Sequence, residues 1–119
     1  MKKTKMLKKN YEFKAIFNKS QISGGKYLVA FIKKNKNQQN FLGIAIGVKI
    51  AKAVHRNHLK RLIRESYNAI EQDIENGYSI IFTWKKGIDF KNAKFADIKK
   101  DMEKVLKKAK VLNSKNEEK

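Results

Sequence analysis

With 119 residues and 41% hydrophobic content, the chain is long enough for one folded domain with a single core. It has no cysteine, which excludes disulfides, thiolate catalysis and cysteine-based zinc sites. Its basic N-terminus is not followed by the apolar run of a secretory signal, and its longest apolar stretches are far short of a membrane span. Its formal net charge of +18 predicts an anionic partner, with nucleic acid as the first candidate and an anionic membrane surface as the second.

Residues 11–17 are the first segment with a helical pattern. Phe13, Ile16 and Phe17 fall on one face of this predicted helix, and Asn10 is its expected N-cap. The apolar stripe has two interpretations. It packs into a core, or it leaves an aromatic pair partly exposed for stacking on bases.

Two predicted strands follow the helix. Residues 20–25, which contain two adjacent glycines, predict a loop, and residues 26–33 have the β-branched and aromatic content of a strand. The polar residues 34–40 predict a hairpin connection to the second strand, residues 41–48.

Small residues alternate along the second strand, at Gly43, Ala45 and Gly47. One face of this strand is therefore nearly bare, so that something large could approach it closely. The approaching group is either a helix of the same protein or an extended ligand.

All three arginines and both histidines lie between positions 52 and 65, in a segment that predicts a helix to about residue 74, with a stop near residues 76–77. Its apolar side consists of Leu59, Leu62, Ile63, Ser66 and Ile70. Its cationic stripe consists of Lys52, Arg56, Lys60 and Arg64, widened by Asn57 and Arg61. Because arginine binds phosphate through two parallel hydrogen bonds, this face predicts a polyanion contact; the alternative is a solvated basic face.

The last two predicted elements are a strand over residues 78–84 and a helix over residues 92–110. The element order predicts an α+β fold, a sandwich around one mixed sheet, in a single domain that spans residues 1–119. Residues 1–8 and 113–119 are expected to be mobile basic or polar arms.

The sequence contains no pattern typical of a protein active site. It has no Ser/His/Asp set, no paired carboxylates within a polar motif and no glycine-rich phosphate loop before a helix. His55 and His58 are three residues apart, but the cations beside them would repel a metal ion, so no metal site is predicted. We therefore expect any catalysis to use the reacting groups of a partner.

Residues 52–65 resemble the signature of the bacterial ribonuclease P protein subunit. That signature has Ala-Val, one variable residue, Arg-Asn, then Lys-Arg and a final arginine, and each part is present here in register. Upstream positions also match the family: Leu7, Lys8, Phe13, Phe17, Gly43 and Lys49. The resemblance covers roughly residues 7–110.

This resemblance implies a two-layer α+β sandwich of order α-β-β-β-α-β-α, with a four-stranded mixed sheet and a left-handed βαβ crossover, contrary to the general handedness rule. It implies a cytoplasmic protein, monomeric and bound one to one to a catalytic RNA that carries Mg²⁺. That RNA hydrolyses the phosphodiester bond at the 5′ leader of precursor tRNA. The protein would bind both the RNA and the leader and would hold no metal of its own.

The resemblance also assigns residues to these two contacts. The contact with the catalytic RNA is implied for Lys49, Lys52, Arg56, Asn57, Lys60, Arg61 and Arg64. The leader cleft is implied for Phe13, Phe17, Phe31 and Ala45. The chain departs from the family pattern at His58, where arginine is usual, and at Ala45, Gly47, Val48 and Ala51.

Two other functional classes remain open on the sequence. One is a ribosomal or other structural RNA-binding protein without a catalytic partner. The other is a protein that binds anionic membranes, although the basic helix offers only leucine and isoleucine opposite its cations, a composition suited to a core.

Overall fold

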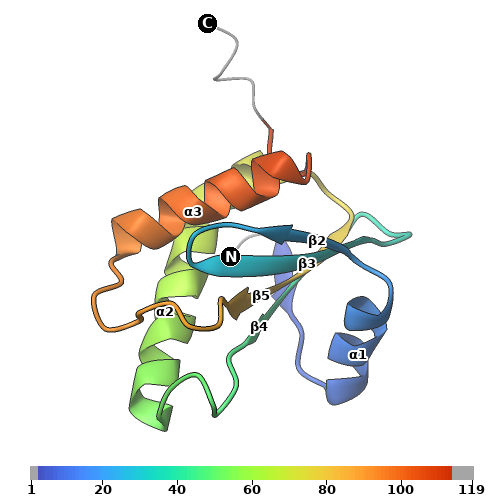
Figure 1. Ribbon diagram of the computed structural model, residues 1–119. Coiled ribbons are helices and arrows are strands. Elements are labelled where there is room, and N and C mark those ends of the chain that lie inside the picture. The colour runs from blue at the N-terminus through green and yellow to red at the C-terminus, as the bar shows by residue number, and fades with distance from the viewer. Residues whose placement is uncertain (1–2, 114–119) are drawn as a thin grey trace, which may run out of the picture.

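The computed structural model describes residues 3–113 and shows three α-helices around one five-stranded sheet (Figure 1). The elements in chain order are β1 Thr4–Met6, α1 Asn10–Asn18, β2 Gln21–Gly24, β3 Leu28–Lys34, β4 Asn40–Ala45, α2 Ala53–Ile70, the short 3₁₀ turn η1 Glu71–Asp73, β5 Tyr78–Trp84 and α3 Phe95–Lys108. The α+β class and the mixed sheet are confirmed.

The strands lie in the order β1-β4-β5-β3-β2. β1 pairs with β4, and β4 with β5, in parallel, whereas β3 pairs antiparallel with both β5 and β2. The connection from β4 through α2 to β5 therefore joins two adjacent parallel strands. The left hand expected for that crossover stays a prediction.

The two faces of the sheet are covered differently. On one face, α2 and α3 bury the main core, with fully buried side chains such as Leu42, Ile63, Phe82 and Met102. On the other face, α1 lies across the strands above a smaller apolar cluster of Leu7, Ile16 and Ile81. Because helices lie on both faces, as Figure 1 shows, the two-layer expectation is wrong.

The residue patterns predicted three strands and the resemblance implied four, whereas the sheet has five. Residues 4–6, expected in a mobile arm, form the edge strand β1 in register with residues 40–42. Residues 21–24, expected in a loop, form the other edge strand, β2. The partner of β1 lies far along the chain, and a local pattern gives little sign of such pairing. β2 is a four-residue strand that forms a hairpin with the next strand, β3, across residues 25–27.

The expected hairpin at residues 34–40 is also wrong. β3 and β4 are consecutive in sequence, but β5 lies between them and pairs with both. Residues 35–39 therefore connect two strands that are not hydrogen-bonded to each other. Gly77, with φ of +91°, lets the chain turn into β5.

The helix bounds differ by a few residues from those expected. The N-cap of α1 is Lys9 rather than Asn10. α2 ends at Ile70, earlier than residue 74, and η1 continues the turn. Of the expected C-terminal arm, only residue 113 lies inside the part of the chain that the structure describes. None of the helices within residues 3–113 is long and apolar enough to cross a membrane.

Candidate nucleic-acid interface

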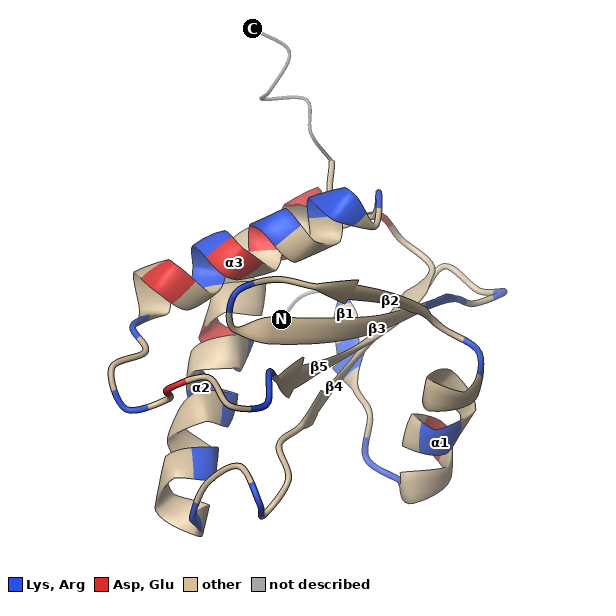
Figure 2. Cartoon of the chain, in the orientation of Figure 1, with Lys and Arg blue, Asp and Glu red and all other residues tan. Residues whose placement is uncertain are grey.

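The basic helix α2 buries the apolar side that its spacing predicted. Leu59, Leu62, Ile63, Ser66 and Ile70 are all buried, and Tyr67 joins them. The mixed polar and cationic side faces outward, with Asn57, Arg61 and Arg64 exposed and Arg56 and Lys60 half-buried. Figure 2 shows these cations along α2, whereas acidic side chains are more frequent along α3. The helix therefore presents its guanidinium groups beside, and not within, the core.

The three arginines differ in their contacts. Arg56 donates from Nη1 to the carbonyl oxygen of Ala51 at 2.8 Å, which ties the helix to the connection before it. Arg61 forms an exposed ion pair with Glu65, with Nε and Oε2 3.5 Å apart. Among residues 3–113, no carboxylate lies within ion-pair distance of Arg56 or Arg64. Most of the positive charge on this face is therefore available to an anionic partner.

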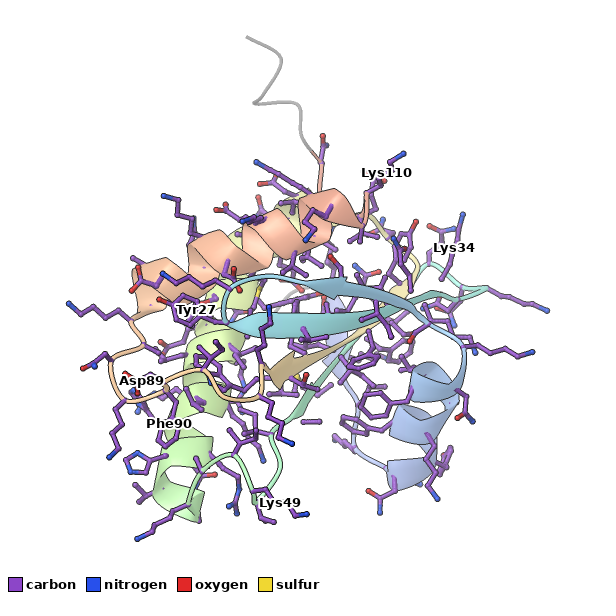
Figure 3. All side chains as sticks on the ribbon, viewed as in Figure 1. Tyr27, Lys34, Lys49, Asp89, Phe90 and Lys110 are labelled. Carbon is purple, nitrogen blue, oxygen red and sulfur yellow. The ribbon has the colours of Figure 1, made fainter. Side chains whose placement is uncertain are left out.

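The start of α2 adds to this charge. Lys52 is the N-cap and makes no side-chain capping bond, and no acidic residue lies in the first turn. Lys49 lies on the connection between β4 and α2, as labelled in Figure 3, and it is exposed. Within its own first turn, the positive end of the helix dipole therefore meets no carboxylate.

The two histidines have different environments. The ring of His55 lies 5.1 Å from the ring of Phe90, between their centroids, so the connection before α3 packs against α2 there (Figure 3). His58 is exposed. No group of three His, Cys, Asp or Glu residues in the described part of the chain is placed to hold a metal ion.

The face of the sheet opposite α2 carries Phe31 and Phe41 and is crossed by α1, which carries Phe13 and Phe17. Gly43, Ala45, Ile81 and Phe31 share this face, by their register. The helix α1 crosses it so closely that a Cβ on Gly43 would lie 2.7 Å from the ring of Phe13. At Gly43 the approaching group is therefore a helix of the same protein. Gly47 lies beyond the strand, and no atom lies near its missing side chain.

Phe17 and Phe31 form an edge-to-face pair beside this crossing. Their ring centroids are 4.8 Å apart and their planes meet at 83°. Phe17 remains 38% exposed, while Phe13, Phe31 and Ala45 are half-buried. The core interpretation of the α1 stripe therefore holds for Ile16, which is buried, whereas stacking of the partly exposed Phe17 on bases stays a prediction.

The start of α1 is fixed by a carboxylate. Glu12 accepts the backbone N–H groups of Lys8 and Lys9, both at 2.9 Å from Oε1. These bonds, the one from Lys8 first, hold the pKa of Glu12 below its ordinary value of 4.5. The side chain therefore stays charged and satisfies N–H groups that the first helical turn would leave free.

Phe41 lies on the same face of the sheet, and the sequence reasoning missed it. It lies two residues before Gly43 on the α1 side of β4 and packs with the smaller apolar cluster. The alternation of a strand, extended back from Gly43 by one step, would have found it.

The sequence and the fold both match known proteins. The ribonuclease P family profile matches residues 1–110. The ribonuclease P protein component of Clostridioides difficile is 36% identical over 107 residues, covering 89% of this chain and 92% of that protein. The ribonuclease P protein component of Fusobacterium nucleatum is 37% identical over 108 residues, covering 89% of this chain and 97% of that protein.

Solved structures agree. The ribonuclease P protein of Staphylococcus aureus superposes with a TM-score of 0.79 at 32% identity, covering 91% of this chain and 97% of that one. The ribonuclease P protein of Thermotoga maritima gives a TM-score of 0.79 at 27% identity, covering 87% of this chain and 96% of that one. This chain therefore belongs to the ribonuclease P family, as the protein subunit of the ribonucleoprotein endoribonuclease that processes the 5′ end of precursor tRNA.

Proposed function

We propose that the cationic side of α2 binds the catalytic RNA of the holoenzyme. The observation that carries this proposal is the outward placement of Arg56, Arg61 and Arg64, whose only carboxylate contact among the described residues is one exposed pair. The remaining contacts are assigned to side chains on the same helix and its approach: Lys49, Lys52, Asn57 and Lys60. The guanidinium groups of the arginines bind phosphates through paired hydrogen bonds and so orient the protein on the RNA. The lysines add electrostatic attraction that does not depend on the RNA sequence.

The 5′ leader of precursor tRNA is assigned to the other face of the sheet. Phe13, Phe31 and Ala45 pack together where α1 crosses the sheet, and the ring of Phe17, which is partly exposed, contacts that of Phe31. A partly exposed aromatic ring such as that of Phe17 can stack through its face on an unpaired base, a contact worth about 1–3 kcal/mol per base. Single-stranded RNA fits this surface better than a duplex, because its bases are free to reach the rings.

The protein's contribution to catalysis is positioning. Mg²⁺, which prefers phosphate and water oxygens, is assigned to the RNA partner, and one protein is assigned to one RNA. Cations along α2 lower the repulsion between the RNA and its substrate, and the cleft holds the leader near the scissile bond. Each effect is largest when little Mg²⁺ is present to screen the phosphates.

The test is reconstitution with the cognate catalytic RNA at low Mg²⁺. Adding the protein should accelerate leader cleavage there and should have a smaller effect at high Mg²⁺. The protein alone should leave precursor tRNA uncut. Cleavage by the RNA that is equally fast with and without the protein at low Mg²⁺ would refute the proposal.

A further inference from the structure

The helix α1 divides the second face of the sheet into two open surfaces. Phe13 and Phe17 lie on one flank of the helix, toward Ala45 and the start of α2. Glu12 and Ala15 lie on its other flank, by helical spacing. On that second flank there is a groove of about 410 Å³ between α1 and the connection from β3 to β4. We call it the upstream groove.

The upstream groove has an apolar floor and a cationic rim. Leu7, Ile16 and Phe41 line the floor; the first two are buried and Phe41 is half-buried. The rim is formed by three lysines, Lys33, Lys34 and Lys36. Lys34 and Lys36 are exposed, and Figure 3 labels Lys34 where the chain leaves β3. An aromatic ring, here that of Phe41, beside several lysines is the combination that binds single-stranded nucleic acid.

Two polar groups of the groove are already engaged with the protein. Lys33 donates from Nζ to the carbonyl oxygen of Ala15 at 3.4 Å, which links β3 to α1 at the side of the groove. Glu12 accepts two backbone N–H groups at the start of α1. Because Glu12 keeps its negative charge, the phosphates of a ligand would lie on the opposite rim, at Lys34 and Lys36.

We propose that the upstream groove binds leader nucleotides that lie further 5′ than those in the cleft. This inference rests on the proposed binding of the leader at Phe13, Phe17 and Phe31. Phe41 lies four residues before Ala45 on β4, or roughly 13 Å further from the start of α2 at the usual rise of a strand. A leader that passes the cleft and continues away from α2 therefore reaches the groove next.

The outward-facing side of α1, which we call its crest, separates the two surfaces, and a leader that occupies both must cross it. Tyr11 is 67% exposed on this crest, and the ammonium of Lys9 lies 5.9 Å from the centroid of its ring. Lys14 is exposed on the same side of the helix. An aromatic ring beside cations can support a nucleotide that crosses from one flank to the other.

The test uses the reconstituted holoenzyme and precursor tRNAs whose leaders are shortened one nucleotide at a time from the 5′ end. The variant is the double substitution Lys34→Gln and Lys36→Gln, at exposed positions outside the cleft. We expect it to bind long leaders about 3- to 10-fold more weakly. The slope of log K against log salt concentration should become shallower by about 1.4, because two phosphate contacts are lost. With short leaders it should bind as tightly as the unmodified protein.

The matched control is Lys100→Gln with Lys104→Gln, which removes the same charge from exposed positions on α3. It should leave long-leader affinity unchanged. Equal loss in both double variants, or no loss at Lys34 and Lys36, overturns the inference about the groove. If the unmodified protein itself fails to favour precursor over mature tRNA, the proposed leader cleft fails instead.

Discussion

The ring of Phe13 fills the space that a side chain at position 43 would need. A Cβ on Gly43 would lie 2.7 Å from Cε2 of Phe13 and 2.9 Å from Cδ1 of Leu7. Both distances are too short for real contacts, so α1 can lie this close to β4 only over a glycine. The height of α1 above the sheet, and with it the shape of the proposed leader cleft, depends on that missing side chain.

Gly43→Ala should lower the free energy of unfolding by about 1–3 kcal/mol, because α1 must move away from the sheet to make room. Affinity for precursor tRNA should fall with it, since Phe13 moves with the helix. Urea unfolding and substrate binding measure the two effects. Gly47→Ala is the control, because no atom lies within 4 Å of its Cβ position; similar losses at both positions would contradict the explanation.

Phe17→Ala should reduce the preference for precursor over mature tRNA, by up to the roughly 1–3 kcal/mol that stacking on one base provides. The matched control is Phe95→Ala on α3, because Phe95 is 39% exposed and Phe17 is 38% exposed. Both variants lose a similar ring, but only Phe17 borders the cleft. Binding of both tRNAs should be compared at one salt concentration, and an unchanged preference in Phe17→Ala would remove this residue from the cleft.

Arg61→Ala should weaken binding to the catalytic RNA while leaving stability nearly unchanged. Its ion pair with Glu65 is exposed and is worth at most about 1 kcal/mol. Arg56→Ala should lower stability by ~1 kcal/mol, because the bond from Arg56 to the Ala51 carbonyl is lost. Filter binding across a salt series and thermal melting separate the two effects. Parallel losses of binding and stability in Arg61→Ala would contradict the assignment.

Asp101→Ala should destabilise the fold by about 3 kcal/mol, because three backbone N–H groups lose their acceptor. The buried carboxylate of Asp101 accepts from Lys26, Tyr27 and Leu28 at 2.7, 2.9 and 3.0 Å, which ties α3 to the turn between β2 and β3. Denaturant unfolding measures the loss. Asp97→Ala, at an exposed position on the same helix, should cost no more than about 1 kcal/mol.

Tyr67 should make the fold sensitive to alkali. Burial raises the pKa of Tyr67 from 10.0 to about 12, and its hydroxyl shares a 2.8 Å hydrogen bond with Thr4 of β1. Between these values the unfolded chain ionises while the folded protein stays neutral, so stability falls as pH rises through this window. Tyr67→Phe should lower the free energy of unfolding by about 1 kcal/mol at neutral pH. Because the variant has no hydroxyl to ionise at this position, its stability should not show this part of the fall with pH.

The measurement is urea unfolding of both proteins from pH 9 upward, with the stability difference between them narrowing above about pH 10. Tyr11→Phe is the control, because Tyr11 is exposed and its substitution should leave the slope unchanged. A constant difference between the unmodified protein and Tyr67→Phe would contradict the raised pKa.

Local spacing was enough to predict several features of this protein. The apolar positions of α2, from Leu59 to Ile70, and the whole of β5 were predicted because each pattern is complete within its own element. The basic motif of residues 52–65 pointed to the right family for the same reason, since its residues are adjacent in sequence.

Only the tertiary structure decided which strands are neighbours and how α1 meets the sheet. β1 finds its partner 36 residues away, and β5 lies between two strands that are consecutive in the chain. Such pairings depend on the side chains that become buried when distant segments meet, a property that no short window contains. In the same way, the alternation of small residues in β4 predicted a close approach, but only packing decided that Phe13 makes it at Gly43.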